Sequence, residues 1–165
     1  MSDTVLSDHA LYQRDFYLWT QRQAAALRRT GALRPNEALD YENLAEEIES
    51  LGKNDRRALR SNIEIVLVHL LKLELSPIEA PRDGSIDSVA EHRTRLEELL
   101  GDSPSLRKEL GSLIESAWRS ARPRALRMLA RDGVAGREVP EDCGYAASDI
   151  LDPGFLPVNR HGLRS

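Results

Sequence analysis

Residues 54–76, NDRRALRSNIEIVLVHLLKLELS, decide the fold. On a helical wheel the apolar side chains of this stretch spread over well over half of the circumference. They are Leu59, Ile63, Val66, Leu67, Val68, Leu70, Leu71, Leu73 and Leu75. A helix with so broad an apolar surface must be surrounded by other helices, because any face left in water would expose hydrocarbon. The stretch therefore predicts the central core helix of an all-α protein, which begins at Asn54 and ends at Ser76, before Pro77.

Four other segments show helical spacing of their apolar residues. The expected ranges are 12–30, 41–51, 86–100 and 103–132. Gly31 and Gly52 are expected to end the first two helices, and Asp40 to cap the second. Pro123 falls inside the last range, where proline removes a backbone hydrogen bond, so a kink or a break into two helices is expected there.

The C-terminal part of the chain is rich in Gly, Pro and acidic residues, with one short helical turn expected at 148–152. Its apolar residues are expected to pack back on the bundle: Tyr145, Ile150, Leu151, Phe155 and Leu156. No segment shows the alternation of a strand. The sequence thus predicts one domain over 1–165, an all-α bundle of five or six helices, with 1–10 and 158–165 flexible.

Composition narrows the class of protein. The 165 residues carry a net charge of −4, and 41% are hydrophobic, which excludes collagen, a disordered tail and a disulfide mini-protein. No apolar run is long enough for a spanning helix, and the acidic start MSDTVLSDHA does not resemble a signal peptide. We expect a cytoplasmic protein that does not associate with membranes and needs no cofactor for stability.

Several stretches together resemble one family: DFYLW, QAAALRRTG, LDYENLAEEIESLG, HLLKL, SPSLR, VPEDCGY and ILDPGFLP. The resemblance is to the bacterial domain-of-unknown-function family numbered 29, and it covers about residues 15–157. It implies an all-α single domain and supplies no activity. The chain departs from the family pattern at Ser85, where a Trp is expected, at His92 for Gln, and at Gly144 for Pro. A site shaped by the missing Trp or Pro would be altered here.

Glu42, Glu46 and Glu49 form a carboxylate ridge on the predicted 41–51 helix. Such a ridge could bind a hard cation, or a metal together with a histidine from a neighbouring helix. However, no histidine follows a glutamate by three residues, and the His-Glu-x-x-His motif is absent. The favoured interpretation is a solvated or Arg-paired acidic face near a helix N-terminus.

Glu47 and His69 are the candidates for acid–base or metal chemistry, with Glu46 as a further ligand. Glu47 lies on the flank of the apolar face, so partial burial could raise its pKa and make it a general base. His69 interrupts the most apolar run and could face Glu47 from the adjacent helix. The alternatives are a structural salt bridge from Glu47 to an arginine and a packed imidazole bonded to a carbonyl or carboxylate. Both are favoured over a site.

Residues 119–131 contain five arginines and no acid. Four of them lie on one side of the wheel: Arg119, Arg124, Arg127 and Arg131. The ridge could follow nucleic-acid phosphates, but the chain is acidic and only 5% aromatic, so nucleic acid is not the favoured partner. We expect instead that Arg124, Arg127 and Arg131 dock on the Glu42/Glu46/Glu49 ridge, within the chain or between subunits.

The single cysteine, Cys143, stands beside Glu141 and Asp142, which disfavour a thiolate, so a small packed thiol is expected.

Because no complete catalytic motif is found, the leading functional hypothesis is a non-catalytic helical interaction protein, acting on a protein partner or by self-association. The first alternative is a metal-binding or carboxylate/histidine enzyme that uses Glu46, Glu47 and His69. The second is a nucleic-acid binder that uses the 119–131 ridge.

Overall fold

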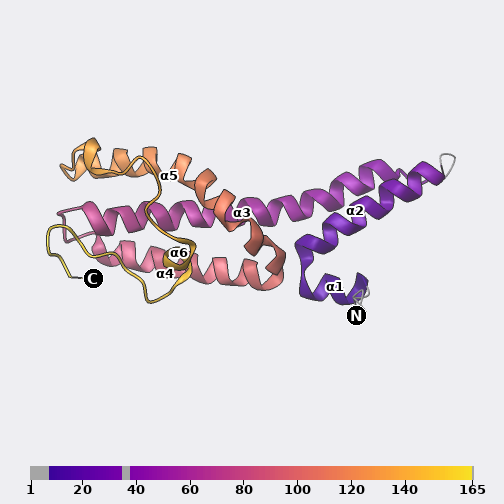
Figure 1. The fold of residues 1–165 in the computed structure, drawn as a ribbon, viewed down its shortest axis with the longest axis horizontal. Coiled ribbons are helices and arrows are strands. Elements are labelled where there is room, and N and C mark those ends of the chain that lie inside the picture. Colours follow the sequence, from indigo (N-terminus) through magenta and orange to yellow (C-terminus); the bar gives the residue numbers. More distant parts are fainter. Residues whose placement is uncertain (1–7, 35–37, 165) are drawn as a thin grey trace. The chain divides into compact units, whose positions relative to one another are not determined.

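The computed structural model describes residues 8–34 and 38–164. They form helices and connecting loops, with no strand in these two ranges. The elements are α1 (Asp8–Arg14), α2 (Phe16–Leu33), α3 (Tyr41–Leu75), α4 (Arg82–Asp102), the 3₁₀ helix η1 (Pro104–Glu109), α5 (Leu110–Arg131), the 3₁₀ helix η2 (Gly136–Glu138) and α6 (Ala147–Leu151). The all-α prediction is confirmed (Figure 1).

Contacts divide the chain into two compact units. The smaller unit comprises Met1–Ala58 with Leu99–Lys108, and the larger comprises Leu59–Glu98 with Glu109–Ser165. Helices α3 and α4 contribute residues to both units. None of the helices in the described ranges combines the length and the apolar character needed to cross a membrane.

The larger unit is built around the second half of α3, as the sequence predicted. Every apolar residue named for the 54–76 stretch is buried there. Helices α4 and α5 run along this half of α3 (Figure 1), and hydrogen bonds tie them to it. Asn62 on α3 pairs with His92 on α4, and the Arg60 side chain donates to Ser116 and Ser120 on α5. The broad apolar circumference of α3 is thereby covered.

The C-terminal segment packs back on the larger unit, as expected. The buried Arg93 guanidinium on α4 donates to the carbonyls of Asp149, Ile150 and Phe155. The attachment continues beyond the family-like region, because the side chain of Asn159 is buried and donates to the carbonyls of Leu73 and Ser76. The expected looseness of 158–165 is therefore wrong at Asn159. Residues 1–7, part of the other end that was expected to be flexible, lie outside the described ranges.

The predicted helix end at Gly52 is wrong, because α3 continues through it. Gly52 is buried in the smaller unit, where α2 lies against the first half of α3 (Figure 1). A Cβ at this position would overlap the hydroxyl of Thr20 and lie 3.2 Å from Cδ2 of Tyr17. Glycine is needed here for the close approach of two helices, and a helix tolerates it at a cost of about 1 kcal/mol.

Other boundaries also moved. The predicted 12–30 helix is interrupted at Asp15, whose carboxylate caps α2 by accepting from the Leu18 amide at 3.0 Å. The start of the predicted 103–132 helix is the 3₁₀ helix η1, which Pro104 opens, and the α-helix α5 begins only at Leu110. Helix α5 runs as one helix through Pro123, so of the kink or break expected there the break into two helices does not occur.

Candidate functional site

The predicted acidic ridge has a basic partner that the sequence analysis did not identify. Arg28 on α2 donates to Glu42 and to Glu49, each at 3.0 Å, and Lys53 lies 3.5 Å from Glu49. The hydrogen bond from Arg28 lowers the pKa of Glu49. All of these residues belong to the smaller unit. The interpretation as an Arg-paired acidic face therefore describes this surface.

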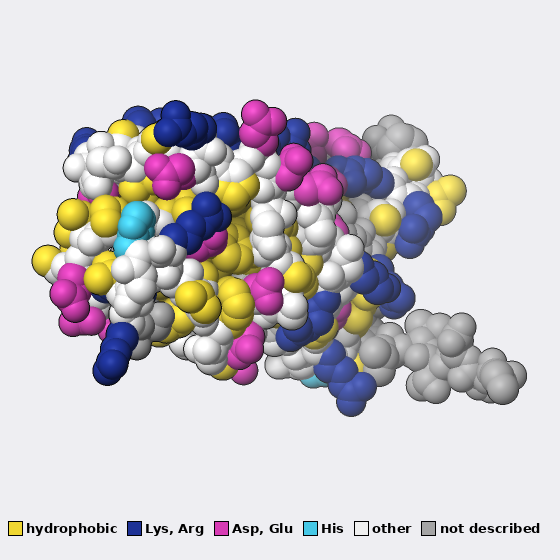
Figure 2. All heavy atoms as spheres, turned by 60° about the vertical axis from the view of Figure 1, so that its left-hand side comes forward, with side chains coloured by type: hydrophobic (Ala, Val, Ile, Leu, Met, Phe, Trp, Pro, Cys, Tyr) yellow, Lys and Arg dark blue, Asp and Glu magenta, His cyan; other side chains and the backbone are white. Residues whose placement is uncertain are grey.

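The arginines of α5 have other surroundings. Arg124 lies 3.8 Å from Glu64 on α3. Arg127 and Arg131 are exposed and form no ion pair with any residue in the described ranges. Lys and Arg side chains gather along the upper edge of the face in Figure 2, at the height at which Figure 1 draws α5. Docking of this ridge on the Glu42/Glu46/Glu49 ridge, within the chain or between subunits, stays a prediction.

Glu47 and His69 do not face each other from adjacent helices. Both lie on α3, 22 residues apart, which is about six helical turns. Glu46 and Glu47 are exposed, so the expected partial burial of Glu47 is wrong. No group of three or more potential metal-ligating His, Cys, Asp or Glu side chains is found in the part of the chain that the structure describes. The Glu46/Glu47/His69 cluster is therefore not assembled.

His69 lies in the larger unit with its Nδ1 atom buried and without a hydrogen-bond partner among the described residues. Burial lowers its pKa to about 4, and the positive charges of Lys72 and Arg124 and the neighbouring His92 act in the same direction. The imidazole is thus neutral near pH 7. The expected hydrogen bond to a carbonyl or carboxylate is not formed at Nδ1.

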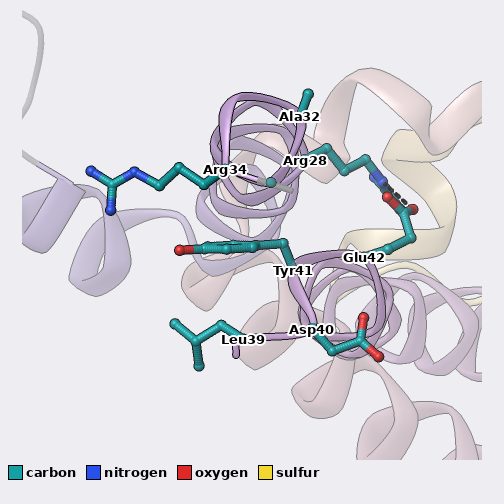
Figure 3. A pocket seen from close by; sticks show the side chains of 8 residues that line it. Arg28, Ala32, Arg34, Leu39, Asp40, Tyr41 and Glu42 are labelled. Atoms are coloured by element: carbon teal, nitrogen blue, oxygen red, sulfur yellow. Dashed lines mark hydrogen bonds and ion pairs between the residues drawn. The ribbon is translucent and has the colours of Figure 1, made fainter. Parts of the chain in front are cut away.

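A hollow of about 340 Å³ lies where α2 ends and α3 begins (Figure 3). Its lining consists of Arg28, Gly31, Ala32, Arg34, Leu39, Asp40, Tyr41 and Glu42. The Tyr41 ring extends beneath the end of α2, because Gly31 has no side chain to oppose the Tyr41 Cβ. Arg28 turns its guanidinium to Glu42 in this view. Two of the charged side chains that line this hollow, Arg28 and Glu42, thus already pair with each other.

A second hollow, of about 330 Å³, is more distinctive in its chemistry. We call it the acid–aromatic hollow, and its lining consists of Tyr12, Gln13, Phe16, Asp55 and Asp102. Tyr12 meets Phe16 edge to face at 5.6 Å between ring centroids, and it meets Trp19 in the same way at 4.8 Å. The hollow therefore combines two carboxylates with a cluster of aromatic rings. All of these residues belong to the smaller unit.

Hydrogen bonds between distant segments hold the walls of this hollow. The Asp15 carboxylate accepts from the amide and the hydroxyl of Ser105, each at 2.8 Å. The buried Ser103 hydroxyl accepts from the Tyr17 amide at 3.1 Å and donates to Asp55 at 3.3 Å. The start of η1 is thereby joined to the α1–α2 corner and to α3.

The negative charge of the hollow is not balanced by a basic side chain in the described part of the chain. Burial raises the pKa of the Asp55 carboxyl, and the charge of Asp102 acts in the same direction, while the Ser103 hydrogen bond opposes both. No basic side chain in the described ranges forms an ion pair with either carboxylate. A cation placed between Asp55 and Asp102 would relieve their repulsion.

The comparisons with known proteins identify the family. The model of the family described as Domain of unknown function DUF29 matches residues 11–156. The chain belongs to DUF29. It is also similar to the crystal structure of an alpha-helical protein of unknown function from Rhodospirillum rubrum, with 26% identity and a TM-score of 0.73. That match covers 87% of this chain and 90% of the other. Among curated proteins, no sequence matches this one.

Two of the stretches by which the sequence resembles DUF29 meet at the acid–aromatic hollow. DFYLW supplies Asp15, Phe16 and Tyr17, and SPSLR supplies Ser103 and Ser105. Sequence reasoning placed the aromatic residues on a helix face and Ser103 at a helix start, but it missed Asp55 and Asp102. The presence of the DFYLW and SPSLR stretches was the only sign of this hollow in the sequence, because its hydrogen bonds join positions about 90 residues apart.

The three positions at which the resemblance led us to expect other residues, 85, 92 and 144, lie in the larger unit. Ser85 is buried near the start of α4, and His92 pairs with Asn62 at 2.6 Å. A Cβ at Gly144 would meet no atom within 4 Å. None of the three lines the acid–aromatic hollow.

Cys143 of this DUF29 chain is half-buried, and its thiol donates to the Tyr145 carbonyl at 3.6 Å. Burial raises the pKa of the thiol. The arrangement favours the protonated form and agrees with a packed thiol, as the acidic neighbours had suggested.

Proposed function

We propose that this DUF29 protein is a non-catalytic helical interaction protein of the bacterial cytoplasm, which binds a protein partner or a second copy of itself through its smaller unit. The observation that carries the proposal is the distribution of exposed large hydrophobic side chains. Five of the seven in the described ranges belong to the smaller unit. They are Tyr12, Leu33, Leu39, Leu44 and Leu51.

Leu44 and Leu51 supply the best-defined part of this surface. They are 41% and 49% exposed, and their spacing of seven residues places them on one side of α3. The half-buried Ile48 lies between them at the three- and four-residue spacing of a helix seam. We call these three residues the α3 stripe. Single exposed leucines are common on soluble proteins, whereas an aligned pair around an apolar residue favours a docking face.

The experiment compares the full chain with a Leu44→Ser/Leu51→Ser variant. Sedimentation velocity over a concentration series measures self-association, and capture from a bacterial lysate measures partner retention. Ile78→Ser is the control, because Ile78 is 43% exposed but belongs to the larger unit. We expect the stripe variant to lose the association that the control keeps. Equal behaviour of the two variants in both measurements would contradict the proposal.

Nucleic acid is the second candidate, and the exposed arginines on α5 favour it. The net charge of −4 opposes non-specific attraction to phosphates. Titration of labelled duplex and single strands at low salt tests this candidate, with Arg127→Gln/Arg131→Gln as the variant. Binding that falls on this substitution would support nucleic acid over a protein partner.

A further inference from the structure

We propose that the acid–aromatic hollow of one chain receives the guanidinium groups of Arg127 and Arg131 from the α5 helix of a second copy. This inference rests on the proposed function and names the partner. The inference involves side chains outside the α3 stripe, so it can fail while the proposed role of the stripe holds, and the reverse.

The hollow has the chemistry of an arginine site. A guanidinium is planar, carries five N–H donors and is weakly hydrated, so it can stack on an aromatic ring while it donates to a carboxylate. Tyr12 and Phe16 provide the rings, and Asp55 and Asp102 provide the acceptors. The Ser103 hydroxyl and the Asp15–Ser105 hydrogen bonds fix the walls before a partner arrives. Less conformational freedom is then lost on binding.

The arginines on α5 have the complementary properties. Arg127 and Arg131 are exposed and four residues apart, so their like charges lie on neighbouring turns and repel each other. Neither forms an ion pair with a described residue, whereas Arg124 on the same side lies near Glu64. Two cations on one helix therefore complement two carboxylates in one hollow, none of which forms an ion pair with a described residue, and of which Asp55 accepts a hydrogen bond from the Ser103 hydroxyl.

We assign the contact to two chains that associate through these groups. Every copy carries both the hollow and the arginine pair, so two copies related by a twofold axis would form the contact twice. Because the charges lie at the surface, the association should weaken as salt is added.

The test uses sedimentation velocity of the full chain with two variants. The hollow variant is Asp55→Asn/Asp102→Asn, and the arginine variant is Arg127→Gln/Arg131→Gln. We expect each to weaken self-association about tenfold or more relative to the unaltered chain. Glu97→Gln/Glu98→Gln is the matched control, since both glutamates are exposed on α4. It should associate like the unaltered chain.

The decisive step mixes the two variants in equal amounts. The arginine variant still offers an intact hollow, and the hollow variant still supplies intact arginines, so the mixture should associate where neither variant does alone. Asp102→Lys serves as a second hollow variant if the double substitution unfolds the chain, because Asp102 is exposed.

Failure of the mixture to associate, or variants that behave like the control, would overturn the inference. Both results leave the α3 stripe as an interaction surface. An unaltered chain that stays monomeric at every concentration also overturns it, and the proposed function would then depend on stripe-dependent capture of another protein.

Discussion

Gly52→Ala tests the close contact between α2 and α3 in the smaller unit. In an open helix interior this substitution would stabilise the protein by about 0.5–1 kcal/mol, because glycine loses more backbone entropy on folding. At Gly52 the new methyl group would overlap the Thr20 hydroxyl and lie 3.2 Å from Cδ2 of Tyr17. Thr20 has no room to move, since it is fully buried and its hydroxyl donates to the Tyr17 carbonyl at 2.7 Å. Overpacking costs about 1–3 kcal/mol, so we expect a net loss of about 1–2 kcal/mol.

Urea unfolding followed by circular dichroism measures the loss. Gly101→Ala is the matched control, because Gly101 is exposed and belongs to the same unit. A Cβ added at Gly101 would meet no atom within 4 Å. It should be neutral or slightly stabilising. Thr20→Ala removes the overlapping hydroxyl, so the double variant should show a coupling of about 1 kcal/mol with Gly52→Ala. The reasoning is refuted if both glycine variants change stability in the same direction, or if the cycle shows no coupling.

Three single side chains give further predictions. The pKa of His69 is lowered from 6.5 to about 4 by burial, so the unfolded chain binds more protons in this interval. The stability contributed by the neutral imidazole is then present above pH 6.5 and lost as the pH falls towards 4. Unfolding in a pH series should show a smaller loss in His69→Gln than in the natural chain, because the pKa of His92 is also lowered by burial and its share of the loss remains. Asp15→Ala removes a helix cap and strands the Ser105 amide, for an expected loss of about 2 kcal/mol or more. Asp40→Ala, an exposed cap of α3, should lose only about 1 kcal/mol by the same unfolding measurement.

The part of the fold that could be predicted is the part set by local pattern. The apolar circumference of 54–76 can be read from a helical wheel, and burial follows directly from it. Gly52 shows where this reasoning stops. A glycine after an apolar stripe is typical of a helix end, and only the tertiary contact with Thr20 reveals that the helix continues.

The candidate site depends even more on contacts between distant positions. Asp15 has the sequence appearance of a polar residue within a helical segment, yet it caps α2 and binds Ser105, 90 positions away. The sequence analysis gave Asp55 no role. Its carboxylate becomes a candidate site residue only because it lines a hollow with Tyr12 and Asp102. Conversely, Glu47 and His69 had suitable chemistry but are far apart along one helix. A sequence shows the type of each residue, but it does not show which distant side chains the fold brings together.

The use of arginine in this chain separates structural residues from those available to a partner. Of the 23 basic residues only three are lysine, which codon composition alone could explain. Yet buried Arg82 donates to the carbonyls of Leu73 and Arg164, and buried Arg93 binds three carbonyls of the C-terminal segment. A lysine could not span several carbonyls in this way, because its three donors diverge from a single nitrogen. Such arginines are explained by the fold. Arg127 and Arg131 have no comparable partner among the described residues, and the proposed contact with a second copy would use these two side chains.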